Sequence, residues 1–313
     1  MRLVVQNDKK GPERFPSRRA RIRGGLAVLA VAALASGCAQ PEAAQVRPAP
    51  GQQRPQAPPA PALGSYADRL HTSHAQRVAA TKRWGLEQVP LIPPQPPTTK
   101  PKATARAGFE VKHQEDWNLP PVFTTVPTKD KVVFLTIDDG AEKDPEFLRM
   151  MRDLKIPYTV FLSDDLIKDD YGYFWKMQAS GVTLNNHTLH HPYLPGLSYE
   201  EQKREICGMQ DIMQERFGKR PKMFRPPYGN YNQDTLRAAK SCGIEYAPIW
   251  NEEVYVDRWE FREDDQRLRP GDIVLTHFRG PNEWNGTMAD DMRRFLSKVT
   301  ADGYAVARLE DYL

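Results

Sequence analysis

From residue 131 to the C-terminus, apolar runs of strand length alternate with stretches of helical length, and glycines separate many of them. The strand-like runs are 131–138, 158–163, 182–186, 222–227, 245–250, 272–278 and 304–309. The clearest helix is 198–217, which Ser198 and Glu201 can open as a capping box and Gly218 can end. This alternation predicts an α/β fold with a parallel sheet curled into a barrel, whose functional residues gather at the C-terminal ends of the strands.

The N-terminal third of the chain has a different composition. Of the 28 prolines, 16 lie between residues 41 and 130. The polar, proline-rich segments there cannot bury enough apolar surface to form a core. We therefore expect a proline-rich linker at 38–65, and an extension at 66–124 with a possible short helix at 67–84 and a second proline-rich stretch. The barrel domain would occupy 125–313.

Residues 1–37 have the pattern of an export signal, with a basic start and an apolar stretch at 26–35 that is too short for a permanent transmembrane helix. The small residues before Cys38 resemble the lipobox of bacterial lipoproteins, in which the cysteine is acylated. We therefore expect lipidation of Cys38 and anchoring to the outer face of the cytoplasmic membrane, with ordinary secretion as the alternative. The lipid anchor would be the only contact with the membrane.

The basic charge of the chain belongs to this signal segment. Residues 1–37 hold eight Lys or Arg and two Asp or Glu, whereas the other residues hold 36 basic and 38 acidic side chains. The rest of the protein therefore carries a slight negative charge and offers no basic surface for an anionic polymer. We expect no nucleic acid partner, and we expect a monomer.

Two cysteines, Cys207 and Cys242, lie on successive predicted helices of the barrel. In an exported protein such a pair can form a disulfide, and two unpaired buried thiols are the alternative. Neither cysteine has a base or a metal ligand beside it in the sequence, so we assign the pair no catalytic chemistry.

Polar residues follow the apolar runs at the ends that are expected to form the site. Asp138 and Asp139 end the first run, and Gly140 lets the chain turn there. Side chains of adjacent strand residues point to opposite faces, so the two carboxylates would serve different purposes unless the chain turns. The alternative is an N-cap for the following helix, which would account for only one of the two aspartates.

The third run is followed by NNHTLHHP, which holds three histidines in five positions. His187 and His191 are four residues apart, so their rings would share a face on one helical turn. One carboxylate and two imidazoles form a common ligand set for catalytic zinc, which leaves a position for a water whose pKa falls to about 7. Thr188 stands where a metalloprotease helix has its base, so Asp138 is the candidate base and Asp139 the candidate third ligand. A polar loop with its histidines facing water is the alternative.

The fourth and sixth runs also end in polar residues. RPPYG, at 225–229, follows the fourth, and the permanent charge of Arg225 can hold a carboxylate ionised and oriented. Two prolines stiffen this turn and remove donors, so the Tyr228 amide can point at a developing oxyanion. His277 ends the sixth run, and its ordinary pKa near 6.5 suits protonation of a leaving amine. A rigid turn with a surface arginine is the alternative for RPPYG.

In chain order, TIDD at 136–139, HTLHH at 187–191, RPPYG at 225–229 and LTH at 275–277 resemble four motifs of the polysaccharide deacetylase family. This family is also called carbohydrate esterase family 4 or the NodB homology domain, and the resemblance extends from about residue 125 to 313. It implies a distorted (β/α)7 barrel and a hydrolase that acts on amide bonds other than peptide bonds.

The resemblance also implies a role for each matched residue. A divalent metal, usually zinc and sometimes cobalt or nickel, would be bound by Asp139, His187 and His191. Asp138 would be the general base, oriented by Arg225. The Tyr228 amide would help the metal to stabilise the oxyanion, and His277 would protonate the departing amine. His190 matches no role.

One family motif has no unique counterpart in this chain. The fourth motif supplies an Asp and a Trp that tune the acid histidine and wall the acetyl pocket. The candidates within WNEEVYVDRWEF are Trp250, Glu253, Asp257 and Trp259. Groups around the ligands set orientation and pKa, so the departure concerns substrate preference and efficiency and not the metal site.

These observations predict a metal-dependent hydrolase that removes N-acetyl groups from amino-sugar polymers, such as peptidoglycan or a chitin-like glycan, at the cell envelope. The alternatives are an O-acetyl esterase acting on a polysaccharide such as xylan, and a non-catalytic lipoprotein that binds glycans. In a third alternative, the proline-rich half binds a partner and the barrel is incidental. Since no predicted ligand or base is missing, the sequence favours the enzyme.

Overall fold

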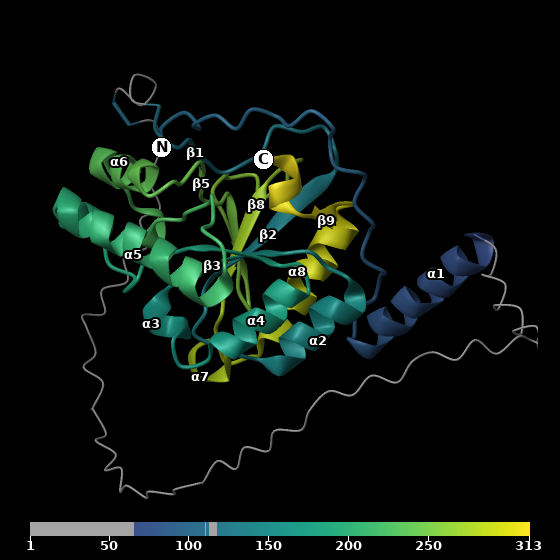
Figure 1. Ribbon diagram of the computed structural model, residues 1–313. Coiled ribbons are helices and arrows are strands. Elements are labelled where there is room, and N and C mark those ends of the chain that lie inside the picture. The colour runs from purple at the N-terminus through teal and green to yellow at the C-terminus, as the bar shows by residue number, and fades with distance from the viewer. Residues whose placement is uncertain (1–65, 110, 113–117) are drawn as a thin grey trace, which may run out of the picture. The chain divides into compact units, whose positions relative to one another are not determined.

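A computed structural model of the chain describes residues 66–109, 111–112 and 118–313 (Figure 1). The predicted export signal, the lipidated Cys38 and the linker at 38–65 lie outside the described residues. Residues 66–313 form one compact unit. None of the helices in the described ranges is long and apolar enough to cross a membrane.

The main sheet is built around β2 (Val132–Asp139), all of whose residues are buried. On one side of β2 lie β3 (Thr159–Leu162) and then β4 (Thr183–Asn186). On the other side lie β8 (Ile273–His277), β6 (Glu252–Val254) and β7 (Trp259–Phe261), and β9 (Ala305–Ala307) pairs with the first residues of β2. All these pairs are parallel except β6 with β7, which form an antiparallel hairpin that the sequence analysis did not predict.

Short contacts close the sheet into a distorted barrel. A separate parallel pair consists of β1 (Val122–Phe123) and β5 (Ala247–Pro248). Single-residue bridges then join β4 to this pair and the pair to the start of β8: Asn186 to Phe224, Met223 to Tyr246, and Thr125 to Asp272. The strands and bridges together agree with the predicted barrel, which is closed on this side by single-residue bridges instead of long strands.

Two of the seven expected strands differ from the prediction. The run 222–227 forms no strand and makes only the bridges at Met223 and Phe224, and the run 245–250 shortens to the two residues of β5. Prolines explain both differences, because a proline has no N–H to donate to a ladder. Pro226 and Pro227 lie at the end of the run 222–227, and Pro248 is the last residue of β5 within the run 245–250. Strands occupy the five other runs.

Helices surround the barrel (Figure 1). They are α2 (Pro145–Leu154), α3 (Asp164–Ile167), α4 (Tyr171–Ala179), α5 (Tyr199–Phe217), α6 (Gln233–Ser241), α7 (Pro281–Trp284) and α8 (Met288–Ala301). The expected capping box of α5 is present, with the Ser198 side chain accepting from the Glu201 amide, and Gly218 ends this helix at φ 73°. The short 3₁₀ turns are Leu194–Gly196, Pro227–Gly229 and Leu309–Tyr312.

A disulfide joins Cys207 on α5 to Cys242 at the end of α6, with the Cα atoms 5.0 Å apart. The two helices lie side by side (Figure 1). Of the two alternatives for this cysteine pair, the structure therefore has the disulfide.

The residues before the barrel pack against it. Helix α1 (Tyr66–Arg83) lies close to the expected helix at 67–84, and Trp84 and Leu86 are buried in the same apolar core as β2. Further along, Leu91 forms a bridge with Ala305, and Arg106 donates a hydrogen bond to the Thr124 hydroxyl at 3.0 Å. The described residues between 66 and 124 therefore help to cover the barrel, a role that the sequence analysis did not assign.

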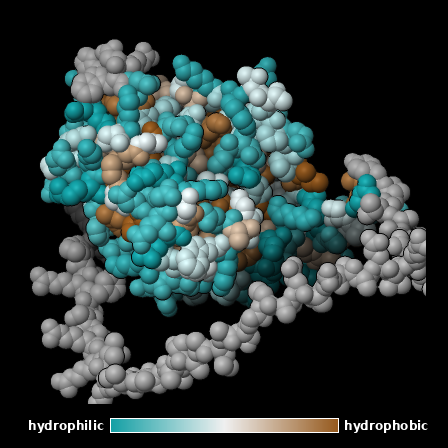
Figure 2. Space-filling model, viewed as in Figure 1, coloured by the Kyte–Doolittle hydropathy of each residue, from teal (hydrophilic) through white to brown (hydrophobic). Residues whose placement is uncertain are grey.

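Few large apolar side chains are exposed on the described residues, and they lie at several places along the chain. Those most exposed are Leu70, Leu91, Ile92, Trp175, Tyr193 and Tyr228. The face shown in Figure 2 is mostly hydrophilic, with small apolar areas separated by polar ones. Isolated apolar side chains are ordinary on a protein surface and need no partner.

Candidate metal centre and active site

The C-terminal end of β2 brings two carboxylates into one pocket. Asp138 and Asp139 are both buried, and Asp138 is in register with His277 on β8. Asp139 has φ 80° and Gly140 has φ 96°, so the strand turns sharply after Asp138. A Cβ at Gly140 would also lie 2.4 Å from Cγ2 of Ile167, so only glycine fits there. The turn lets consecutive carboxylates face the same site.

The histidine segment after β4 is a loop, and the expected helical turn is wrong. Thr188 and His191 have φ values of 74° and 54°, which a right-handed helix does not contain. Side chains take over the local hydrogen bonds: the Thr188 amide donates to Asn186 Oδ1 at 2.9 Å, and the His191 amide donates to Thr188 Oγ1 at 3.1 Å. The loop still places the rings of His187 and His191 together, with centroids 4.8 Å apart. His190 points away and pairs with Glu205 at 2.7 Å.

Asp139, His187 and His191 form the one group of metal-ligating side chains found within the described ranges, with their ligand atoms all within 4.8 Å of one another. Oδ1 of Asp139 lies 3.5 Å from Nε2 of His187 and 3.3 Å from Nε2 of His191. This oxygen is buried and has no hydrogen-bond partner among the described residues. An unpartnered buried carboxylate oxygen facing two ring nitrogens fits a divalent cation.

The protonation of the two histidines also suits a metal. Nδ1 of His187 lies 2.7 Å from the backbone oxygen of Arg225, so it donates a proton there and leaves Nε2 with its lone pair toward Asp139. Burial is the main cause that lowers the pKa of His191 to about 4, so its ring stays neutral. Burial raises the pKa of Asp139, but the neighbouring imidazoles, His187 first, and Arg279 outweigh it and hold the pKa below its usual range. All three residues can therefore act as ligands near neutral pH.

Arg225 holds the second carboxylate. Its fully buried guanidinium donates to Oδ1 of Asp138 at 2.8 Å, to Oγ1 of Thr136 at 3.0 Å and to the Pro248 carbonyl at 2.9 Å. The other oxygen of Asp138 lies 3.7 Å from Nε2 of His187. Asp138 is thus fixed in orientation beside the metal ligands by a buried ion pair, as the sequence analysis predicted for Arg225.

Tyr228 lies next to the histidines. It occupies the middle of the turn Pro227–Gly229 at φ 61°, and its ring packs against His191 with centroids 4.7 Å apart. Its side chain is 60% exposed, so the turn forms part of the rim of the site. The Trp250 ring packs closely against this turn: a Cβ added at Gly229 would lie 3.0 Å from it.

The structure identifies the carboxylate partner of His277. Nδ1 of His277 lies 3.3 Å from Oε1 of Glu253 on β6, an ion pair whose atoms are not aligned as a hydrogen bond. Burial lowers the pKa of His277, but Glu253, with smaller contributions from Asp139 and Asp138, outweighs it and raises the pKa to about 9. His277 therefore carries a proton at neutral pH.

The other candidates for the fourth motif lie elsewhere. Asp257 is exposed and pairs with Arg258. The Trp259 ring stacks with the rings of Phe261 and Phe295. The aromatic ring beside His277 belongs instead to Trp284 on α7, with centroids 6.0 Å apart.

Two functional candidates were missed by the sequence analysis, Arg279 and Trp284. Nη2 of Arg279 lies 2.6 Å from Oδ2 of Asp139, and its Nε lies 2.7 Å from Oε2 of Glu283. Both residues follow His277 by a few positions: Arg279 lies between β8 and α7, and Trp284 is the last residue of α7. Their place after a strand end was the available signal, since that is where barrel sites are built.

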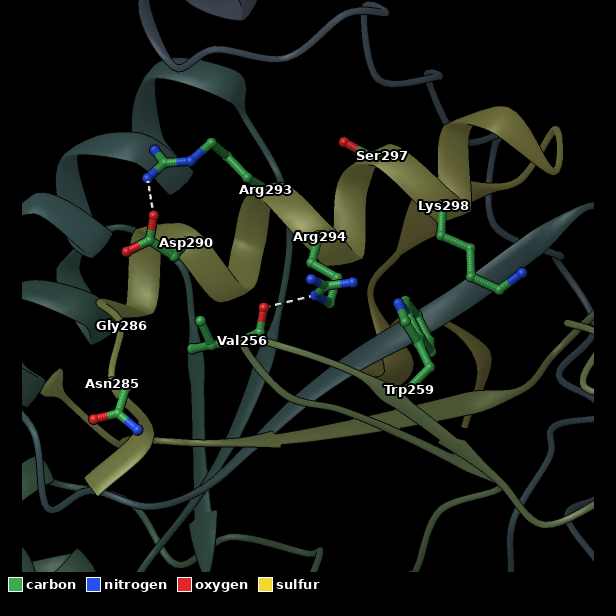
Figure 3. A pocket seen from close by; sticks show the side chains of 9 residues that line it. All are labelled: Val256, Trp259, Asn285, Gly286, Asp290, Arg293, Arg294, Ser297 and Lys298. Carbon is green, nitrogen blue, oxygen red and sulfur yellow. Dashed lines mark hydrogen bonds and ion pairs between the residues drawn. The ribbon is translucent and has the colours of Figure 1, made fainter.

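A separate open groove of about 780 Å³ lies along α8 (Figure 3). Its lining residues are Val256, Trp259, Asn285, Gly286, Asp290, Arg293, Arg294, Ser297 and Lys298. The cations already have partners: Arg293 pairs with Asp290, Arg294 donates to the Val256 carbonyl at 2.6 Å, and Lys298 pairs with Asp302. Apart from Trp259, one of the candidates for the fourth motif, the groove contains no residue of the predicted site, so this groove does not mark the chemistry.

Comparisons with known proteins agree with the geometry. A family model described as polysaccharide deacetylase matches residues 125–247, which include Asp138, Asp139, His187, His191 and Arg225. An uncharacterized protein of Streptomyces coelicolor is 42% identical over 196 residues, 62% of this chain and 78% of that protein. A peptidoglycan-N-acetylglucosamine deacetylase of Bacillus cereus is 25% identical over 197 residues, 60% of this chain and 91% of that protein.

The fold is also found among solved structures. A protein of Bacillus anthracis described as a pseudoenzyme of carbohydrate esterase family 4 superposes with a TM-score of 0.53 at 19% identity, over 62% of this chain and 69% of that one. This likeness concerns the fold alone, which supports the predicted distorted barrel. The residues matched by the family model and the Streptomyces relative show that the chain belongs to the polysaccharide deacetylase family of hydrolases, carbohydrate esterase family 4.

Proposed function

We propose that the protein is a metal-dependent deacetylase that removes N-acetyl groups from amino-sugar polymers, with peptidoglycan or a chitin-like glycan as substrate. The observation that carries the proposal is the buried, unpartnered Oδ1 of Asp139 between His187 and His191, beside a second carboxylate, Asp138, that Arg225 holds in place. A relative from Bacillus cereus is named for deacetylation of N-acetylglucosamine in peptidoglycan, which supports this class of substrate.

The metal would be held by Asp139, His187 and His191, and we propose zinc, with cobalt or nickel as substitutes. When bound, the cation supplies Lewis acidity, which makes a water molecule more acidic and polarises the acetyl carbonyl. Asp138 accepts the proton of the attacking water. Its hydrogen bond with Arg225 occupies one oxygen and leaves the other 3.7 Å from Nε2 of His187.

Two further residues act on the acetyl group and the leaving amine. The Tyr228 amide lies in the turn beside His191 and donates to the oxyanion that forms when water adds to the carbonyl. His277 then donates its proton to the sugar nitrogen as the C–N bond breaks, so that acetate and a free amine leave. An amide nitrogen must be protonated as it leaves, and the raised pKa of His277, about 9, keeps that proton available at neutral pH.

We also propose that the enzyme works outside the cytoplasmic membrane, anchored by a lipid on Cys38, with secretion as the alternative. This part rests on the sequence pattern of residues 1–38. A Cys38→Ala variant should move from the membrane fraction to the soluble exported fraction. An unchanged distribution of that variant would contradict the anchor.

The central test combines metal analysis with an acetate-release panel on the purified chain. We expect about one equivalent of a divalent metal, and acetate release from N-acetylglucosamine oligomers or peptidoglycan that exceeds release from acetylated xylan. Chelation should stop the reaction and added zinc should restore it. Preference for acetylated xylan would make the protein an O-acetyl esterase. A protein without metal that zinc does not activate would be a glycan-binding member of the family, and the proposal would be wrong.

A further inference from the structure

The two oxygens of Asp139 have different surroundings. Oδ1 faces the ring nitrogens of His187 and His191 and has no hydrogen-bond partner within the described ranges. Oδ2 points the other way and lies 2.6 Å from Nη2 of Arg279. One oxygen is therefore available to a cation, and the other is taken by a permanent positive charge.

Arg279 is itself held in place. Its Nε lies 2.7 Å from Oε2 of Glu283 on α7, so the guanidinium is fixed between two carboxylates. Its own amide donates to the His277 carbonyl at 2.9 Å, which makes a tight turn directly after β8. The residue before Arg279, Phe278, donates a backbone hydrogen bond to the Asp138 carbonyl at 3.1 Å and accepts one from the Glu142 amide at 3.0 Å. The backbone that carries Arg279 therefore has little freedom to move away from Asp139.

This arrangement bears on how a carboxylate can bind a metal. Carboxylates bind cations through one oxygen or through both, and a free side chain can rotate between the two modes. A catalytic zinc site needs three protein ligands and an open fourth position. If both oxygens of Asp139 bound the cation, the second oxygen would take up the position that the reaction requires.

We propose that Arg279 is a positioning residue that occupies Oδ2 of Asp139 and so limits this carboxylate to one metal-binding oxygen. The inference rests on the proposed metal-dependent function and deepens it. Arg279 contacts the ligand and not the substrate. Its loss therefore changes the coordination of the metal and the rate of the reaction, and it leaves substrate binding nearly unchanged.

The experiment uses the cobalt-substituted full chain, because the visible absorption of Co²⁺ is strong in a four-coordinate site and weak at higher coordination. Arg279→Met removes the charge and keeps an apolar stem of similar width. We expect metal to remain bound, the visible absorption to fall, and kcat to drop by about 10- to 100-fold while KM changes less than about twofold. Arg279→Lys should restore part of both signals, since an ammonium can still reach toward Oδ2.

Two further variants complete the test. Arg204→Met removes an exposed arginine of α5, whose ion pair with Glu201 spans 4.0 Å, and should match the unaltered protein in every measurement. Glu283→Gln keeps Arg279 and removes one of its two anchors, so it should shift the spectrum in the same direction by a smaller amount, even if Arg279→Met does not fold.

The outcomes separate this inference from the proposed function. Unaltered cobalt spectra in Arg279→Met and Glu283→Gln would overturn the role of Arg279 and leave the deacetylase proposal standing. A rise in KM with an unaltered spectrum would also overturn it, because Arg279 would then contact substrate. If the unaltered protein bound neither cobalt nor zinc, the proposed metal-dependent function itself would fail.

Discussion

The proposed active site has two halves that differ in how tightly the chain holds them. The metal half consists of Asp138, Asp139, His187, His191 and Arg225, and the acid half consists of His277, Glu253 and Trp284. The metal half lies within residues 125–247, which match the family model, and Arg225 holds Asp138 through an aligned hydrogen bond of 2.8 Å. The acid half lies beyond the matched residues, and its ion pair spans 3.3 Å without alignment.

The difference teaches which requirements a sequence can express. A metal needs its ligands at fixed distances and angles, so the ligands must come from particular strand ends at particular spacings. A carboxylate that keeps a histidine protonated needs only to be close in space, and it can reach the histidine from any neighbouring element. In this chain the carboxylate is Glu253 on β6, in a hairpin where the sequence has no unique match to the family motif.

The largest expected effect is the loss of the metal half. His187→Ala removes one ligand and the hydrogen bond to the Arg225 carbonyl, so the purified variant should contain no stoichiometric metal and should release acetate at the background rate. His190→Ala is the matched control, because His190 pairs with Glu205 and faces away from the site. Elemental analysis and acetate assays check both variants. A metal-loaded His187→Ala variant would contradict the ligand assignment.

Asp138→Asn should come next, since it removes the base and keeps the ligands. We expect kcat to fall by about 10²- to 10⁴-fold, the usual contribution of a general base, with the metal still bound. Metal content and kcat are measured on the same preparation. A decrease of less than tenfold would assign the proton transfer to another group.

Glu253→Gln tests the acid half. The acid form of His277 is present below its pKa of about 9 and is lost as the pH rises through that value, so turnover should decline on the alkaline side. Without the Glu253 charge, burial acts with less opposition and the pKa of His277 falls. If it reaches about 6.5, kcat at pH 7.5 decreases about tenfold and the alkaline limb moves to lower pH.

The unaltered protein and the Glu253→Gln variant are compared with the same metal bound. A bound cation repels the proton on His277 and so lowers its pKa in both proteins. Glu260→Gln, which removes a carboxylate that pairs with Arg258, is the control. A pH profile of Glu253→Gln that coincides with that of the unaltered protein would show that Glu253 does not set the protonation of His277.

The smallest effect on activity is expected from the disulfide, which belongs to neither half. Replacing both Cys207 and Cys242 by serine should lower the free energy of unfolding by about 2–4 kcal/mol, because the bond closes a loop of 35 residues in the unfolded chain. We expect kcat to stay within about twofold. Urea unfolding of the double variant measures the first quantity, and a large loss of kcat would show that α5 and α6 position the metal half.

The barrel and the metal half could be predicted because local sequence carries them. The apolar run before Asp138 specifies a buried strand, and the spacing of His187 and His191 brings two rings together even in a loop. The helical turn expected for these histidines was wrong because the Asn186 and Thr188 side chains compete with the backbone for its hydrogen bonds. Local spacing was preserved although the local conformation differed.

Other features depend on distances that appear only after folding. The bridge from Asn186 to Phe224 closes the barrel through a single residue pair, which is too short to leave a strand pattern. Glu253 and Arg279 act through partners that are distant along the chain. Arg279 lies two residues after His277, but its partner is Asp139, 140 residues earlier. A sequence shows that a charge is present and does not show which charge it will meet.

Arg225 contacts both the proposed base and a proposed ligand, through different parts of the same residue. Its guanidinium binds Asp138 and its carbonyl accepts the proton of His187. A shift of the turn that carries Arg225 would therefore act on the proposed proton acceptor and on the proposed metal ligand at once, because a single residue bonds to both.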